Sequence, residues 1–101
     1  MLESEYQQSL KKKLEHIFKG CVILKNDPNY IQGFPDLTIF YKNKWAVLEV
    51  KKDISEMSKT TASIRNQKFY IRMLDKMSFA RFIYPQNEEE VLDELQQAFR
   101  S

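Results

Sequence analysis

Two apolar segments joined by a short polar turn constrain the fold of this chain more than any other feature. Residues 36–41 and 45–51 are rich in β-branched and aromatic side chains, and residues 42–44 between them leave room only for a hairpin turn. Alternation along the second segment places four side chains on one face of the strand: Trp45, Val47, Glu49 and Lys51. The hairpin is therefore expected to carry ionisable groups at the end of an otherwise apolar sheet.

Two carboxylates mark the ends of this hairpin. Asp36 begins the first strand, and Glu49 lies near the end of the second, followed by Val50 and Lys51. Ions at the end of a buried strand are costly to desolvate unless they are compensated, and a divalent cation compensates paired carboxylates. One His and one Cys are too few for a zinc site of the usual kind, so any metal must be held by oxygen. We therefore predict Mg²⁺, with Mn²⁺ as a substitute, held by Asp36, Glu49 and the Val50 carbonyl.

The same residues resemble the two signature elements of the PD-(D/E)xK nuclease superfamily, with Pro35-Asp36 as the first and Glu49-Val50-Lys51 as the second. Together with Gly33 and Gln67, they look most like VRR-NUC domains and the junction-resolving endonucleases of phages and archaea, over about residues 3–77. The resemblance implies a restriction-endonuclease-like α/β fold over residues 1–101, with a mixed four-stranded sheet and the order α-β-β-β-α-β-α. It also implies a magnesium-dependent endonuclease that hydrolyses phosphodiester bonds in branched or Holliday-junction-like DNA, with Lys51 as a catalytic residue.

Hydrophobic periodicity predicts the elements that surround the hairpin. They are a helix ending at about Phe18, a strand over 21–25, a helix over about 60–77, a strand over 79–84, and a last helix whose capping box begins at Asn87. The first helix has an apolar stripe of Tyr6, Leu10, Leu14, Ile17 and Phe18, and the last has one of Val91, Leu92, Leu95, Ala98 and Phe99.

The helix predicted over residues 60–77 has two contrasting sides. Its apolar side gathers Ile64, Tyr70, Ile71, Leu74 and Met77, and Gln67 falls at the centre of that side. In the resembled nucleases a glutamine at this place points toward the active site, whereas the alternative is a core glutamine satisfied by the backbone. The other side is basic and is expected to contact DNA phosphates through Arg65, Lys68, Arg72 and Lys76.

The first helix offers a third carboxylate for the site. On a continued helix Glu3 projects within the apolar stripe, whereas Glu5 projects nearly opposite, so Glu3 is the better catalytic and metal-binding candidate. The resembled nucleases carry a glutamate in this helix. Against this choice, residues 4–7 fit a capping box that would leave Glu3 outside the helix.

Charge is distributed unevenly along the chain. The formal net charge of +2 conceals a basic middle, because residues 51–86 contain eight Lys or Arg and only three Asp or Glu. Residues 87–101 are acidic, with one Lys or Arg and five Asp or Glu. The basic middle follows the Glu49-Val50-Lys51 element, where a DNA backbone would have to lie. Ordinary solubilising charge is the alternative interpretation.

The size and composition of the chain lead to expectations about its partners and its location. A small domain has little surface for gripping a duplex, and a two-fold homodimer would match the symmetry of a junction, with Phe69 or the last helix as its contact. A lone cysteine and the lack of a long apolar stretch favour an intracellular, cytoplasmic protein without a membrane partner, and the resemblance allows a phage origin. The alternatives are a nuclease acting on single strands, flaps or RNA, and a non-catalytic nucleic-acid-binding module.

Overall fold

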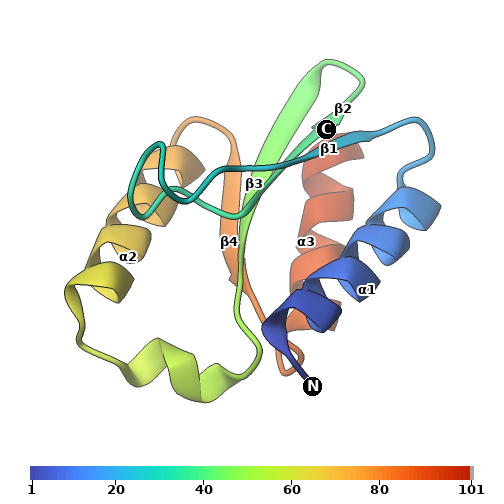
Figure 1. Cartoon of the computed structure of the whole chain (residues 1–101). Helices are drawn as coiled ribbons and strands as arrows, with labels where there is room; N and C mark the ends of the chain where they lie inside the picture. The colour runs from blue at the N-terminus through green and yellow to red at the C-terminus, as the bar shows by residue number, and fades with distance from the viewer. Residues whose placement is uncertain (101) are drawn as a thin grey trace.

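The computed structural model describes residues 1–100, which form a mixed four-stranded sheet flanked by helices (Figure 1). The elements in chain order are α1 (Glu3–Ile17), β1 (Val22–Lys25), β2 (Leu37–Tyr41), β3 (Lys44–Val50), the 3₁₀ helix η1 (Ile54–Ser58), α2 (Ala62–Asp75), β4 (Phe79–Ile83) and α3 (Glu88–Arg100). The strands lie in the order β1-β2-β3-β4, with the first three antiparallel and β4 parallel to β3. The predicted α/β class and the predicted order of α-helices and strands are confirmed.

The two faces of the sheet are covered unequally. Figure 1 shows α1 and α3 together on one side of the strands and α2 on the other. The α1 and α3 side contains most of the core, including the fully buried Leu10, Leu14 and Leu95 against Leu37, Ile39 and Leu48 of the hairpin. The α2 side has a smaller cluster of Val47, Leu74 and Ala80, with Phe34, Trp45, Tyr70 and Ile71 packed around it. The sheet is thus stabilised mainly by the core on its α1 and α3 face, and its α2 face has room for polar groups.

A two-residue turn sets the register of the hairpin. Tyr41 pairs with Lys44, and Lys42 in the turn has a φ of 57°, the left-handed conformation that tight hairpins require. From this turn the ladder runs without interruption to the pair Leu37 and Leu48. Ala46 and Leu48 face α1 and α3 whereas Val47 faces α2, which confirms the predicted alternation.

Helix α1 begins earlier than a capping box at residues 4–7 would allow. Its first residue is Glu3, and the Glu5 carboxylate accepts a hydrogen bond of 2.8 Å from the backbone N–H of Leu2. The capping interaction therefore reaches back to Leu2, and Ser4 lies inside the helix. As a result Glu3 is helical, which is the condition that its proposed role requires.

Two other local predictions are wrong. The Asn87 side chain bonds to the preceding strand and turn, accepting from the Tyr84 N–H at 2.8 Å and donating to the Phe82 carbonyl at 3.0 Å, so it does not form the predicted capping box. Met77 was expected on the apolar side of α2 but is 64% exposed. Helix α2 ends at Asp75, so Met77 no longer follows the helical wheel.

None of the helices within residues 1–100 combines the length and the apolar character needed to cross a membrane.

A glycine fixes how closely the segment before β2 approaches α2. Gly33 has a φ of +87°, and a Cβ atom built on it would lie 2.6 Å from the Cβ of Asn66, inside van der Waals contact. Gly20 has nearly the same φ, +89°, but no atom lies within 4 Å of its Cβ position. The two glycines therefore share a left-handed backbone conformation, which only a glycine adopts without strain, and differ in crowding.

We expect Gly33→Ala to destabilise the fold more than Gly20→Ala. Each change places an alanine in the left-handed region, at a cost of about 1–2 kcal/mol, which corresponds to roughly 4–8 °C in Tm for each kcal/mol in a domain of this size. Gly33→Ala must in addition displace the α2 backbone, so its loss of Tm should be at least about twice that of Gly20→Ala. Equal losses in thermal unfolding would contradict the close packing of this segment on α2.

Candidate active site

The hairpin register brings the two predicted carboxylates together. Leu37 pairs with Leu48, and continuing the same register by one residue sets Asp36 opposite Glu49. Directly opposed residues of an antiparallel pair have Cβ atoms about 5 Å apart on the same face of the sheet. Asp36 and Glu49 are therefore neighbours because of strand pairing, which needs no unusual loop conformation.

The Asp36 carboxylate is held by the backbone of β3. Its Oδ2 atom accepts a hydrogen bond of 2.9 Å from the N–H of Val50. The N–H and C=O of one residue in an extended strand point toward the same neighbouring strand, so the Val50 carbonyl also faces the side on which Asp36 lies. The side chain of Val50 is fully buried in the core that contacts α1 and α3. Val50 thus presents only backbone groups toward the site, as its predicted role as a carbonyl ligand requires.

Glu49 is the most perturbed ionisable group at this end of the sheet. Its side chain is buried, with the residue 3% exposed, and its Oε1 atom has no hydrogen-bond partner among residues 1–100. Burial, followed by the nearby Asp36 charge, raises the pKa of Glu49 to about 9, and Lys51 counteracts only part of this effect. Without a bound cation, Glu49 therefore keeps its proton near neutral pH.

Lys51 places a fixed amine beside this pair. Its Nζ lies 3.6 Å from Oε2 of Glu49, and its side chain is 12% exposed. The backbone N–H of Lys51 bonds to the Ile83 carbonyl at 2.9 Å, which continues the parallel ladder between β3 and β4. The backbone that carries the ammonium is consequently held by pairing with β4.

A cavity of about 370 Å³ connects the carboxylates with α2. Its walls come from the segment before β2, from β3 and from the first half of α2: Pro28, Gln32, Gly33, Phe34, Asp36, Glu49, Ala62, Ser63, Asn66 and Gln67. Gln67 is half-buried at this wall, and its Oε1 atom is buried without a hydrogen-bond partner. The alternative interpretation of Gln67 was a core glutamine whose amide bonds to the backbone, and its Oε1 atom makes no such bond.

Glu3 is not among the residues that line this cavity, but its carboxylate lies close enough to Asp36 and Lys51 to interact with them electrostatically. Partial burial and then the Asp36 charge raise the pKa of Glu3, and the Glu3 charge in turn raises the pKa of Glu49. Glu3 is therefore electrostatically coupled to both hairpin carboxylates, although its side chain is exposed. The Glu5 carboxylate is occupied by the Leu2 N–H.

The oxygen atoms present suit a hard divalent cation. Glu49 Oε1 and Gln67 Oε1 are buried acceptors without donors, and both residues line the same cavity as Asp36. Within residues 1–100, no three His, Cys, Asp or Glu side chains are grouped closely enough to form a metal site by themselves. Two carboxylates with amide and carbonyl oxygens make a sparse site, which fits Mg²⁺ because this ion keeps several of its waters.

The four basic residues of α2 are all exposed, as predicted, but two of them also bind backbone. Arg65 donates to the Thr60 carbonyl at 2.5 Å, and Lys68 donates to the Met57 carbonyl at 3.2 Å. Both bonds fasten the segment between β3 and α2. Arg72 and Lys76 lie farther along the helix, within and just after its last turn.

Several residues of the site region were missed in the sequence. Ser63 and Asn66 line the cavity from α2, and Gln32 lines it from the opposite wall. The spacing of Ser63, Asn66 and Gln67 at three and four residues was a usable signal, because it places them on one face of a helix. Glu56 in η1 raises the pKa of Glu3, and no periodic pattern marks that short segment.

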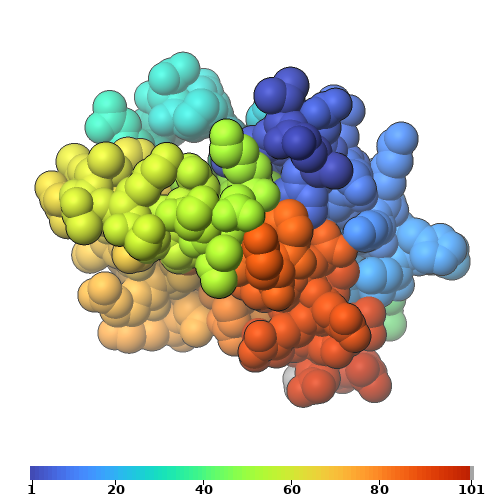
Figure 2. Space-filling model, turned by 90° about the horizontal axis from the view of Figure 1, so that it is seen from below, coloured from blue at the N-terminus to red at the C-terminus, as the bar shows by residue number. Residues whose placement is uncertain are grey.

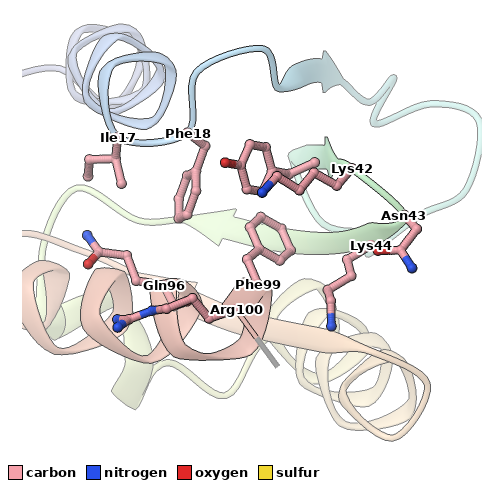
Figure 3. A pocket seen from close by; sticks show the side chains of 9 residues that line it. Ile17, Phe18, Lys42, Asn43, Lys44, Gln96, Phe99 and Arg100 are labelled. Carbon is pink, nitrogen blue, oxygen red and sulfur yellow. The ribbon is translucent and has the colours of Figure 1, made fainter.

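A larger cavity, of about 660 Å³, lies at the other end of the sheet around the hairpin turn (Figure 3). Figure 3 shows Phe18 and Phe99 beside this space, with Lys42, Lys44 and Arg100 around it. Ile17 and Arg100 come from the last turns of α1 and α3, so two helix C-termini lie at this cavity. The positive charges of Lys42, Lys44 and Arg100 suit the negative ends of the two helix dipoles. Within residues 1–100 no Asp or Glu lines this cavity, and the candidate site remains the smaller one at Asp36 and Glu49.

No protein-family model, curated protein or solved structure matches this chain.

The raised pKa of Glu49 makes the stability of the fold depend on pH in a direction unusual for a glutamate. The folded state keeps the Glu49 proton up to about pH 9, whereas the ordinary pKa is 4.5. The unfolded state therefore binds fewer protons between these values, and the free energy of unfolding falls as pH rises through this range.

In EDTA, we expect Glu49→Gln to raise Tm relative to the wild type by roughly 5 °C or more at about pH 8, and by much less at about pH 5. Thermal unfolding at the two pH values measures the difference, and Mg²⁺ should raise the wild-type Tm at the higher pH. The control Glu90→Gln changes an exposed carboxylate on α3 and should show no such contrast. A Glu49→Gln effect that is the same at both pH values would contradict a protonated Glu49.

Proposed function

We propose that this chain is a divalent-metal-dependent DNA endonuclease with a restriction-endonuclease-like PD-(D/E)xK core. The observation that carries the proposal is the pair of buried oxygens without donors, Glu49 Oε1 and Gln67 Oε1, in one cavity with Asp36 and beside Lys51. Buried acceptors without donors are costly, and a cation compensates both at once. An ammonium next to a cation site supplies the positive charge that phosphodiester hydrolysis requires.

Each residue of the site has a distinct role in this proposal. Asp36, oriented by the Val50 N–H, and Glu49 are the carboxylate ligands of the metal, and the Val50 carbonyl adds a backbone oxygen. Glu3 contributes negative charge, directly or through water. Gln67 supplies an amide that holds a ligand or an attacking water in place.

Lys51 is the catalytic cation of the proposed reaction. Its Nζ is positioned to stabilise the negative charge that develops on the phosphate oxygens, or to orient the attacking water. Mg²⁺, when bound, would polarise the phosphodiester and lower the pKa of water. Metal binding also requires Glu49 to release its proton, so binding should strengthen as pH rises.

Branched DNA and a symmetric homodimer are the finer parts of the proposal. One candidate active site per chain would cut one strand, so a two-fold dimer would cut the two equivalent strands of a junction. The α2 cations Arg65, Lys68, Arg72 and Lys76 are exposed on the same helix that carries Gln67, where they can contact phosphates without reading bases. An intracellular setting, as expected from the sequence, is part of the same proposal.

A non-catalytic binding module is the second candidate function. It is favoured by the exposed basic side of α2 and does not need the carboxylates. A buried Glu49 with an unpartnered oxygen would then weaken the fold without any function. The catalytic proposal accounts for both features and is preferred.

We expect cleavage of DNA in the presence of Mg²⁺ or Mn²⁺ and none in excess EDTA. Asp36→Asn and Glu49→Gln each remove a ligand charge, so both should reduce turnover by more than about a hundredfold and weaken metal binding measured by calorimetry. Lys51→Ala should reduce turnover similarly but spare metal binding, because the ammonium is not a ligand. Lys44→Ala, at the far end of β3, is the matched control.

Cleavage that persists in EDTA would overturn the metal dependence. DNA binding by the wild type without cleavage of linear, flapped, four-way or single-stranded substrates in either metal would favour the binding module.

The two glutamates of the first helical turn provide an internal comparison. Glu3→Gln removes a charge coupled to Asp36 and Glu49, so it should lower turnover by about tenfold or more. Glu5→Gln keeps an oxygen that can accept from the Leu2 N–H and should leave both turnover and Tm nearly unchanged. Steady-state cleavage by the two variants decides the matter, and a larger loss from Glu5→Gln would exclude Glu3 as the third carboxylate.

A further inference from the structure

The segment between β1 and β2 is braced at its base next to Asp36. The backbone N–H of Asn26 bonds to the Asp36 carbonyl at 2.7 Å, and its side-chain amide donates to the Pro35 carbonyl and to the Thr38 hydroxyl, each at 2.9 Å. The two ends of the loop are therefore fastened to each other. Any group that the loop carries keeps a fixed position relative to Asp36.

The middle of this loop is also ordered by internal bonds. The Asp27 side chain accepts from the Asn29 N–H at 2.8 Å, and the Asp27 carbonyl accepts from the Tyr30 N–H at 3.2 Å. The Ile31 carbonyl accepts from the Phe34 N–H at 3.2 Å. Gly33 then packs against the backbone of α2. The loop is thus a rigid projection, which Figure 2 shows in cyan at the edge of the molecule, beside the yellow surface of the α2 region.

Two apolar side chains are exposed on this rigid projection. Tyr30 is 77% exposed and Ile31 is 42% exposed, although the bonds of the loop hold their backbone. With Asn26, Asp27 and Phe34 they line a cavity of about 220 Å³. An aromatic ring and an aliphatic side chain held in water beside a small cavity suit a flat apolar ligand.

This small cavity adjoins the candidate active site. Phe34 lines both cavities, and Pro28, Gln32 and Gly33 of the same loop line the one that contains Asp36 and Glu49. The loop is therefore a common wall between the proposed cleavage site and the Tyr30 cavity. In a nucleic acid, a flat base lies one sugar away from each phosphate, so one strand can occupy both cavities.

We propose that Tyr30 and Ile31 form a stacking platform for an unpaired nucleobase next to the scissile phosphodiester. This inference rests on the proposed function and names its substrate class: DNA in which that nucleotide is unpaired, as at a fork, flap or branch. A base inside a duplex is stacked on its neighbours and is not available to Tyr30, whereas an unpaired base stacks readily on an aromatic ring.

The platform selects for an unpaired base and not for a sequence. The side-chain NH₂ group of Asn26 already donates to Pro35 and Thr38, and the Oδ1 atom of Asp27 accepts from the Asn29 N–H. Few polar groups remain in the cavity to read the edge of a base. Stacking on an aromatic ring tolerates every base.

Fluorescence of 2-aminopurine tests the platform without requiring cleavage. The probe is a forked DNA with 2-aminopurine as the first unpaired nucleotide, compared with a duplex in which the same 2-aminopurine is paired, and the full-length protein is added in EDTA. We expect the wild type and Tyr30→Phe to quench the forked probe, and Tyr30→Ala to lose most of the quenching. The control Phe40→Ala removes another exposed aromatic side chain, near the hairpin turn of β2, and should quench as the wild type does.

Cleavage provides the second measurement. With Mg²⁺, Tyr30→Ala should cut forked DNA about tenfold more slowly than the wild type does, because the unpaired base loses its stacking partner. Cleavage of linear duplex should change by less than about twofold, since no unpaired base is present to engage the ring. Tyr30→Phe should cleave both substrates as the wild type does.

The outcomes separate this inference from the proposed function. Metal-dependent cleavage together with equal quenching by the wild type and Tyr30→Ala would overturn the platform and leave the nuclease standing. Quenching that requires Tyr30, with no cleavage of any DNA in Mg²⁺ or Mn²⁺, would overturn the nuclease and support base stacking. If Tyr30→Ala changes only the oligomeric state in sedimentation, the surface is a protein contact and the inference is wrong.

Discussion

The register of the β2–β3 ladder is the constraint on which the rest of the site depends. It pairs Leu37 with Leu48 and thereby sets Asp36 opposite Glu49. A slip of one residue would turn Glu49 toward the apolar core of α1 and α3 and would expose Leu48 to the cavity. The buried hairpin residues on both faces and the left-handed Lys42 turn resist such a slip. Strand pairing therefore specifies the geometry of the candidate site as well as the fold.

The polar groups that destabilise the fold lie on one side of the sheet, and most of the stabilising apolar core lies on the other. The α2 side holds a buried glutamate with an unpartnered oxygen, a half-buried glutamine and a small apolar cluster. The opposite side holds the larger core, where α1 and α3 are also joined by Glu88, which accepts from the Tyr6 hydroxyl at 2.8 Å and contacts the Lys13 ammonium at 2.6 Å. A well-packed face can thus hold the strands in register while the other face remains open and polar.

Regular periodicity is what made most of this structure predictable. The stripes of α1 and α3 and the alternation of β3 follow directly from sequence spacing, and so did the meeting of Asp36, Glu49 and Lys51 at one end of the hairpin. The segment 52–61 and the loop before β2 have no such pattern, because contacts with distant residues determine them. Gln86, for example, bonds to Asp53 at 2.7 Å across 33 positions of sequence. Asn87 fits a capping pattern locally, yet the preceding strand and turn compete successfully for its side chain.

The basic residues of α2 show how one side chain can serve both structure and recognition. Arg65 and Lys68 each donate to a backbone carbonyl of the segment that follows Lys51, so they fix one side of the region next to the cavity. A carbonyl is a dipole and does not cancel a full charge, so both residues still contribute to the positive potential of this helix. An anionic strand drawn toward α2 would then meet a segment already ordered by the same cations. Arg65 and Lys68 thereby contribute both to the attraction of an anionic strand and to the order of the segment beside the cavity.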